Sequence, residues 1–496
     1  MLRYAAMGTA VAAASIVLAG CASAPARPGA GRVLSLEETI DSVTSTPPLD
    51  RTHWGIAVWD VAGRRWRARV NADRHFIPAS NTKLVVGTAS LGLLGPDYRY
   101  RTPVRLIGLD GDSARVLMVE GRGDPTWSAR FHDSDFTVTD SIADLVAAAG
   151  VRRITGGIII DASSFTDEPV PGTWEVGDLT GSYAPPVDAL AIAEGTFRVA
   201  IAAATRPGET AVVTQLGAPG LQPLSAWIRT DTARARGRRA VDYLDRADSV
   251  RMVGTIGLGR TDTVRYSVTD PPAYAGRALE NALRVRGVDI RYPLRVLRDT
   301  AESAAWSRPG PGDTVLATVV SPPLAEIVAA MLGPSQNWIA EQLVKTIGLA
   351  RTGHGSWQRG IEEEETWMVE QAGINSTAFF LRDASGLSAQ NLLAPSMIVR
   401  LLEYAGTQPW GDAFRNGLPA PGLEDGTLEN RLAGYENRIR AKTGTITNVN
   451  SLSGYMSGGR ELIFSIMTNG SGTSSAAVRR GIDRIVQAVA REGGQP

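Results

Sequence analysis

Apolar residues recur at helical spacing in several stretches of the chain and alternate with polar residues in others. Helical spacing, with capping residues at the ends, predicts helices over 35–43, 80–94, 142–149, 272–286, 323–332, 338–344, 356–372 and 478–489. Strand-like runs at 54–59 and 64–70 flank a turn and predict a hairpin. Three further runs, at 438–442, 450–456 and 461–468, predict strands in hairpin succession near the C-terminus.

The middle of the chain has a different pattern. Between about residues 101 and 314, short strand-like runs separated by Gly, Pro and Asp dominate, at 116–119, 157–160, 197–203, 211–215, 250–256 and 263–268. Pro309-Gly310-Pro311-Gly312 marks the end of this pattern, and predicted helices follow it. We therefore predict a β-rich region, 101–314, inserted into a domain formed by 49–100 and 315–496.

The N-terminus has the features of an export signal. Arg3 precedes an alanine-rich apolar run over 5–18, and the run ends in Leu18-Ala19-Gly20-Cys21, which resembles a bacterial lipobox. We expect a lipoprotein signal peptide over 1–20, then a lipidated Cys21 and a tether over 21–48. Stable anchoring to a membrane needs more than one acyl chain. An ordinary signal with an incidental cysteine is the alternative. Because Cys21 is the only cysteine, disulfides and thiolate metal sites are excluded.

The basic residues are distributed unusually. The 496 residues carry 51 acidic and 51 basic side chains, and this balance gives no indication of nucleic-acid binding. Only three of the basic residues are lysines, namely Lys83, Lys345 and Lys442. Arginine does not deprotonate in proteins, whereas a buried lysine shifts its pKa readily. Lys83 and Lys442 lie in short motifs, and Lys345 is expected to be a solvated helix residue.

Three motifs occur in order. Ser80 and Lys83 are three residues apart on a predicted helix, so a desolvated amine can lie beside the hydroxyl and activate it. Ser335-Gln336-Asn337 lies at a break between two predicted helices, and Lys442-Thr443-Gly444-Thr445 ends a predicted strand. Each motif alone is weak. Together and in this order they are typical of penicillin-binding proteins and serine β-lactamases.

The long gap between Ser80 and Ser335 restricts the resemblance to one family within this group. The sequence resembles the class C low-molecular-mass penicillin-binding proteins, which are D-alanyl-D-alanine carboxypeptidase/endopeptidases of peptidase family S13. Further matching stretches are Gly121–Pro125, Gly156–Phe165, Asp383–Ser388 and Gly422–Arg431. The sequence departs from the family at Ala193-Glu194-Gly195-Thr196, where asparagines are frequent.

The resemblance implies an α/β (α+β) fold. The catalytic domain would be transpeptidase-like, with an antiparallel sheet and helices on both faces, and the insertion would form two subdomains. The implied activity is cleavage of peptidoglycan stem peptides or cross-links through an acyl-enzyme, with β-lactam binding and without metal or cofactor. The implied location is the cell envelope, outside the cytoplasm and anchored by lipid.

The resemblance also implies residue roles. Ser80 would be the nucleophile and Lys83 the base. Ser335 would relay a proton, Asn337 would orient Lys83 and the substrate, and Lys442 would supply positive charge. Thr443 and Thr445 would bind the substrate carboxylate, and Gly444 would let the substrate lie along the strand. The oxyanion hole would be the N–H groups of Ser80 and Thr445.

Other chemistries fit the sequence less well. The four histidines are scattered, no G-x-S-x-G or H-E-x-x-H motif occurs, and Gly121–Pro125 is more simply a turn than a phosphate loop. From the resemblance we expect Asp383–Ser388 to line the site, with a capped turn as the alternative. We expect Trp174, Asp178 and Tyr183 to pack in a core, with a peptide pocket in the inserted region as the alternative. The alternatives are a β-lactamase or esterase of the same fold, and a penicillin-recognising sensor or scaffold that is acylated without turnover.

Overall fold

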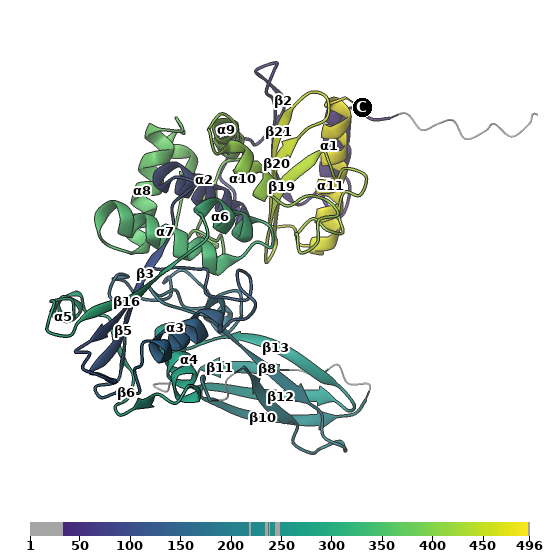
Figure 1. Cartoon of the computed structure of the whole chain (residues 1–496). Coiled ribbons are helices and arrows are strands. Elements are labelled where there is room, and N and C mark those ends of the chain that lie inside the picture. Colours follow the sequence, from purple (N-terminus) through teal and green to yellow (C-terminus); the bar gives the residue numbers. More distant parts are fainter. Residues whose placement is uncertain (1–32, 218–219, 234–236, 238, 244–248, 495–496) are drawn as a thin grey trace, which may run out of the picture.

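The computed structural model describes residues 33–217, 220–233, 237, 239–243 and 249–494. The predicted signal peptide, Cys21 and the first part of the expected tether lie outside these residues. Figure 1 shows an upper part, in which helices flank a sheet made by both ends of the chain, and a lower β-rich part made by its middle.

The upper sheet has five strands in the order β19-β20-β21-β1-β2, and all neighbours are antiparallel. The strands are β1 (His53–Asp60), β2 (Arg65–Val70), β19 (Ile439–Ile446), β20 (Val449–Met456) and β21 (Leu462–Asn469). The predicted N-terminal hairpin and the three predicted C-terminal strands are confirmed. Because β21 pairs with β1, the two ends of the chain complete one sheet.

Helices lie on both sides of this sheet. They are α1 (Leu36–Ser45), α2 (Lys83–Leu94), α6 (Leu324–Leu332), α7 (Asn337–Thr352), α8 (Trp357–Glu370), α9 (Pro395–Gly406), α10 (Gly411–Gly417) and α11 (Ser475–Glu492). α1 begins with a capping box, in which the N–H of Glu38 donates to Ser35 Oγ and the N–H of Ser35 donates to the Glu38 carboxylate. α1 packs against α11, so this part of the expected tether belongs to the folded body.

The alternation of side chains along β1 explains the two helix layers. Ile56 and Val58 are buried with α1 and α11 on one face, whereas Ala57 and Trp59 are buried with α9 on the other. Successive strand residues point to opposite faces, so a strand covered on both sides is apolar at almost every position. The expected antiparallel sheet with helices on both faces is confirmed.

The lower part is entered and left through paired strands. β3 (Arg101–Ile107) and β16 (Thr314–Val320) are antiparallel neighbours in a five-stranded sheet of order β15-β7-β5-β3-β16. Its other strands are β5 (Val116–Glu120), β7 (Ile158–Asp161) and β15 (Arg295–Leu297). Unlike the upper sheet, it contains parallel pairs, β5 with β7 and β7 with β15.

Helices and small sheets complete the lower part. The predicted helices near 142 and 272 are confirmed as α3 (Thr137–Ala148) and α4 (Pro271–Val285), and α5 (Thr300–Trp306) is additional. One small sheet contains β4 (Ser113–Ala114), β6 (Arg153–Ile154) and β14 (Asp289–Ile290). Two others are built from β8 (Thr196–Ala202), β9 (Val212–Leu216) and β13 (Thr261–Ser267), and from β10 (Leu224–Asp231), β11 (Arg239–Tyr243) and β12 (Val250–Gly257).

Short elements connect these layers. They are the 3₁₀ turns η1 (Ala79–Thr82), η2 (Val176–Asp178), η3 (Ala193–Gly195) and η4 (Ser376–Ala378), and the two-stranded pair β17 (Phe379–Phe380) and β18 (Leu392–Leu393). The chain between β7 and η3 turns back toward the upper part. Phe165 and Val187 from this segment are buried in the same core as Ile339 and Leu343 of α7.

The expectation for Lys345 was wrong. Its side chain is fully buried on α7, and its Nζ lies 2.6 Å from Asp167 Oδ1 and 3.7 Å from the ring centroid of Trp357. The segment between β7 and η3 covers this face of α7 and brings Asp167 with it. All three lysines of the sequence are therefore fully buried, and the basic side chains on the described surface are arginines and histidines.

Candidate active site

Ser80 lies in the 3₁₀ turn η1, immediately before α2, and Lys83 is the first residue of α2. The sequence predicted both residues on one α-helix. In a 3₁₀ turn, residues i and i+3 are eclipsed, so the two side chains are stacked more directly than on an α-helix. The Lys83 Nζ donates to the Ser80 Oγ at 3.0 Å. Ser80 itself is partly exposed.

The Lys83 amine is buried among oxygen acceptors. In addition to Ser80, its Nζ donates to Asn337 Oδ1 at 2.6 Å and to the Ser385 carbonyl at 2.7 Å. Burial lowers the pKa of Lys83 to about 7, although the carboxylates of Glu341 and Asp383 act in the opposite direction. A substantial fraction of this amine is therefore neutral near pH 7, and a neutral amine can accept a proton.

The second motif bridges α6 and α7. Ser335 has a left-handed backbone conformation, with φ of +65°, and its Oγ accepts a hydrogen bond from Lys442 Nζ at 2.7 Å. Asn337 is the first residue of α7, and its Nδ2 donates to the Tyr183 carbonyl at 2.8 Å. That contact leaves Oδ1 of Asn337 facing Lys83, so a residue of the lower part fixes the orientation of the amide.

The third motif forms the β19 edge beside the serine. Lys442 is fully buried, and its pKa lies well below the usual value because of burial and then the nearby charge of Lys83. The Thr443 hydroxyl donates to Thr427 Oγ1 at 2.7 Å, whereas Thr445 is exposed. A β-carbon added at Gly444 would lie 3.0 Å from the Ser80 nitrogen and 2.2 Å from Ser451 Oγ. Only glycine allows β19 to approach the serine turn this closely.

Three polar residues attach the turn that carries Ser80 to the upper sheet by hydrogen bonds. Sequence reasoning missed all three. Asn81 Nδ2 donates to the Lys442 carbonyl at 2.9 Å, and its Oδ1 accepts from Ser453 Oγ at 2.5 Å. Ser451 Oγ donates to the Pro78 carbonyl at 2.7 Å. Ser451 and Ser453 are polar residues at alternate positions of the fully buried strand β20. This pattern in the sequence could have identified them.

A cavity of about 450 Å³ opens at Ser80. It is lined by two predicted site residues besides the serine, Asn337 and Thr445, by Glu175, Asp178 and Tyr183 of the lower part, and by Gly386, Leu387, Ala389, Ile446 and Thr447. The expectation that 383–388 line the site is confirmed for Gly386 and Leu387, and the Ser385 carbonyl reaches Lys83. Core packing was wrong for Asp178 and Tyr183, which face the cavity because η2 and the following loop lie over it.

Trp174 is buried, as the packing interpretation expected, but it also makes a polar contact to the site. Its Nε1 donates to Asp383 Oδ2 at 2.9 Å. Asp383 in turn accepts from the N–H groups of Gly386 and Ser388 at 2.8 and 2.7 Å. The loop that supplies the Ser385 carbonyl to Lys83 is therefore anchored from both parts of the molecule.

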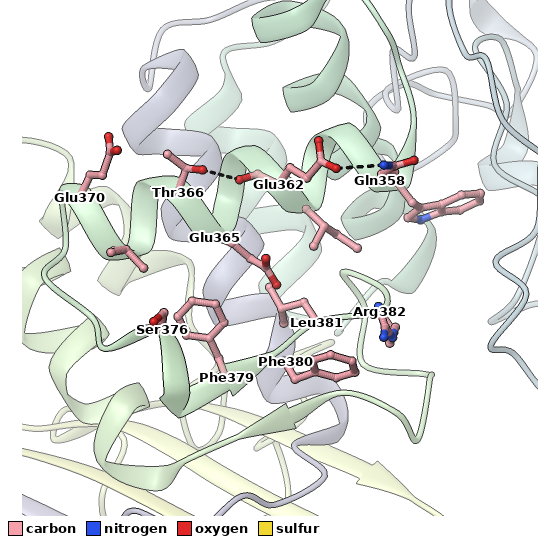
Figure 2. A pocket seen from close by; sticks show the side chains of 13 residues that line it. Gln358, Glu362, Glu365, Thr366, Glu370, Ser376, Phe379, Phe380, Leu381 and Arg382 are labelled. Atoms are coloured by element: carbon pink, nitrogen blue, oxygen red, sulfur yellow. Dashed lines mark hydrogen bonds between the residues drawn. The ribbon is translucent and has the colours of Figure 1, made fainter.

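A larger hollow, of about 740 Å³, lies elsewhere on the upper part. Figure 2 shows it between α8 and the segment that carries β17, with Phe379, Phe380 and Leu381 across from Glu362, Glu365 and Thr366. None of the predicted site residues lines it. Size alone therefore does not select the site, and the arrangement of side chains around Ser80 is what makes the smaller cavity the candidate site.

The described residues contain no group of three or more His, Cys, Asp or Glu side chains placed to hold a metal ion. Within the same part of the chain, no helix has the length and apolarity needed to cross a membrane. Cys21, the predicted lipidation site, lies outside the described residues.

The fold and the order of its motifs define the class of penicillin-binding and serine β-lactamase-like proteins. The structure superimposes on penicillin binding protein 4 (dacB) from Haemophilus influenzae with a TM-score of 0.78 at 22% identity, covering 91% of this chain and 98% of that one. The same protein complexed with a β-lactam matches with a TM-score of 0.73 at 22% identity, over 92% and 99% of the two chains.

The chain belongs to the D-Ala-D-Ala carboxypeptidase 3 (S13) family, whose model matches residues 36–492. It is 32% identical to a D-alanyl-D-alanine carboxypeptidase from an Actinomadura species, over 94% of this chain and 87% of that protein. It is also 24% identical to the D-alanyl-D-alanine carboxypeptidase DacB of Haemophilus influenzae, over 82% and 83% of the two chains. The protein is thus a serine hydrolase of the D-Ala-D-Ala carboxypeptidase type.

Proposed function

We propose that the protein cleaves the D-Ala-D-Ala bond of peptidoglycan stem peptides through an acyl-enzyme on Ser80. The contact of 3.0 Å between Lys83 Nζ and Ser80 Oγ, with the pKa of the amine lowered to about 7, carries this proposal. Lys83 takes the hydroxyl proton as Oγ bonds to the carbonyl carbon of the penultimate D-alanine. Asn337 keeps the amine directed at the serine.

The leaving group departs on the other side of the serine. As the peptide C–N bond breaks, the amine of the terminal D-alanine receives a proton through Ser335, whose Oγ lies 2.7 Å from Lys442 Nζ. Water then hydrolyses the ester, releases the shortened peptide and restores the Ser80 hydroxyl. The negative charge that develops on the carbonyl oxygen in both steps is stabilised by the N–H groups of Ser80 and Thr445.

The terminal carboxylate of the substrate is held at the β19 edge. Thr445 is exposed at the cavity and supplies a hydroxyl to it. Lys442 contributes positive charge from below the surface, because the bound carboxylate raises the pKa that burial lowers in its absence. Thr443 joins the contact by exchanging its present partner, Thr427 Oγ1. Gly444 leaves space for the substrate backbone beside the strand.

Defined muropeptides test this function. The wild-type enzyme should release D-alanine, read by mass, from stem peptides that end in D-Ala-D-Ala. Ser80→Ala should release none. Carboxypeptidase and endopeptidase reactions use the same acyl-enzyme, so parallel digestion of cross-linked dimers measures the proportion of the two. Failure of the wild-type enzyme to cleave either class, while it still forms a stable penicillin adduct, would instead support the sensor or scaffold.

The site also fits β-lactams, whose strained amide presents a carboxylate and a carbonyl in the same relative positions. A solved relative from Haemophilus influenzae is complexed with a β-lactam. We expect a long-lived adduct on Ser80. Turnover of many equivalents of penicillin would favour the β-lactamase alternative, and rapid cleavage of simple esters alone would favour the esterase.

We also propose that the protein acts in the cell envelope, outside the cytoplasm, and is anchored to a membrane by lipid on Cys21. The support is the apolar run ending in Leu18-Ala19-Gly20-Cys21. Wild-type protein should fractionate with membranes and incorporate labelled palmitate, whereas Cys21→Ser should take up no label and be uncleaved or mislocalised. Soluble, unlabelled wild-type protein would remove the anchor. We further propose that 101–314 form the inserted region, which the pairing of β3 with β16 supports.

A further inference from the structure

Glu341 is a fully buried carboxylate directly behind the catalytic lysine. It lies on α7 four residues after Asn337, so the two side chains share one face of the helix. Its carboxylate accepts three hydrogen bonds: Oε1 accepts from the Ser385 N–H at 2.7 Å, and Oε2 accepts from the Ala384 N–H at 3.1 Å and from Trp357 Nε1 at 2.8 Å. Neither Glu341 nor any of the three residues that donate to it belongs to the three sequence motifs.

These bonds hold the backbone that contacts Lys83. The peptide units on either side of Ala384 donate their N–H groups to Glu341, and the carbonyl of Ser385 accepts from Lys83 Nζ at 2.7 Å. The amine therefore has three acceptors, of which Ser80 Oγ is the reacting one and Asn337 Oδ1 is fixed by α7. The third acceptor, the Ser385 carbonyl, depends on the position of the loop that carries it. The hydrogen bonds from this loop to Glu341 hold it in place.

Building on the proposed function, we propose that Glu341 is a positioning residue for acylation. Its carboxylate holds the Ala384–Ser385 backbone so that the Ser385 carbonyl receives the Lys83 amine and keeps it directed at the serine.

The charges around Glu341 give this role a measurable signature. The groups that face it are Lys83 from α2, Asp383 from the loop, Glu364 from α8 and Lys345 from α7. The negative charge of Glu341 raises the pKa of Lys83 against the larger effect of burial. Burial and then Asp383 raise the pKa of Glu341 itself to about 7, which is in the same range as the lowered pKa of Lys83.

Glu341→Gln tests the proposal because it keeps the shape and removes both the charge and one acceptor oxygen. Glu364→Gln is the matched control. Glu364 is another fully buried glutamate, on the adjacent helix α8, and its Oε1 has no hydrogen-bond partner among the described residues. Burial holds the pKa of Glu364 well above the usual value, so the amide closely mimics its protonated form. The readout is the second-order rate constant for acylation by a labelled penicillin as a function of pH, with thermal melting to show folding.

We expect Glu341→Gln to lower the plateau rate by about 10- to 100-fold, since a hydrogen bond to a charged group is lost. The acid limb of its profile should also move to lower pH, because Lys83 loses a nearby negative charge. Glu364→Gln should leave the plateau rate and the position of the acid limb unchanged. Glu341→Asp, which keeps the charge but shortens the reach, should lower the rate and leave the limb near its wild-type position.

Three results would overturn the role. One is a wild-type profile for Glu341→Gln. Another is an equal loss in Glu341→Gln and Glu364→Gln, since that would be the effect of removing any buried acid. If Glu341→Gln does not fold, a wild-type rate in folded Glu341→Asp also overturns it. Labelling of wild-type Ser80 is measured in the same series, and its absence would refute the proposed function rather than the role of Glu341.

Discussion

Lys83 Nζ lies 3.0 Å from Ser80 Oγ, and no other titratable nitrogen hydrogen-bonds to this hydroxyl among the described residues. The amine is buried and its pKa is lowered to about 7. These two properties distinguish it from the arginines that supply nearly all other cations of the chain. They make Lys83 the candidate base, and a substitution and a pH profile test that role.

Lys83→Arg should lose acylation because a guanidinium does not deprotonate and cannot take the serine proton. We expect a loss of about 10²–10⁴-fold, the usual contribution of a general base. Lys442→Arg is the matched control: Lys442 is equally buried, but its proposed role is charge, which arginine keeps. Rates of adduct formation with labelled penicillin measure both. Equal losses in the two variants would mean that burial of a larger side chain, and not loss of the base, explains the effect.

Acylation should rise with pH through about 7. Below the lowered pKa of Lys83, which is about 7, the amine is protonated and cannot accept a proton; above it, the amine is neutral. The rate should therefore fall by about tenfold for each pH unit on the acid side of this limb. Penicillin acylation of the free enzyme from about pH 5 to 9 measures it. A flat profile over that range would exclude Lys83 as the base.

Gly386→Ala should damage the site more than it damages the fold. The glycine has φ of +79°, and an added β-carbon would lie 1.9 Å from the Ala79 carbonyl oxygen, next to Ser80. We expect slower acylation and a lower melting temperature. Gly373→Ala is the matched control, since Gly373 also has a positive φ, +64°, but open space around it. Gly373→Ala should lower the melting temperature only through backbone strain and should leave acylation unaffected. Identical acylation rates in the two variants would contradict the steric explanation.

Lys345→Met should destabilise the protein without moving the acid limb of acylation. The buried Lys345 amine pairs with Asp167 at 2.6 Å, and we expect a loss of about 1–3 kcal/mol in the free energy of unfolding when this charged partner is removed. Arg351→Met, on the same helix, removes an exposed pair with Glu363 and should cost under about 1 kcal/mol. Denaturant unfolding compares them. Equal stability of the two variants would show that the buried pair contributes no more than the exposed one.

Much of the fold could be predicted from local patterns. The strand-like runs of β1, β2, β20 and β21 identified the upper sheet, and helical spacing identified α4 and α11. α9 was missed although Met397, Ile398, Leu401 and Leu402 have helical spacing. The parallel strand pairs of the lower part could not be predicted, because pairing across long gaps is not encoded in local periodicity.

The motif residues were predicted because their spacing is unusual. The buried residues that hold them in place were not predicted. The burial of Lys345 depends on a segment that lies 158 to 177 positions earlier in the sequence, which no local pattern of α7 reveals. Glu341 has the sequence context of an ordinary helix residue. Trp174 and Tyr183 lie within 101–314, and their hydrogen bonds to Asp383 and Asn337 link this part of the chain to the candidate site.

The central claim is that Ser80 is the nucleophile, and its labelling by penicillin tests this most directly. Protein beginning after Cys21 is treated with labelled penicillin and measured by intact mass, and the modified peptide is then sequenced. We predict one adduct per chain, located on Ser80, and none in Ser80→Ala with an unchanged circular dichroism spectrum. An adduct of equal yield in folded Ser80→Ala, or one located on another residue of the wild-type protein, would contradict the assignment of Ser80.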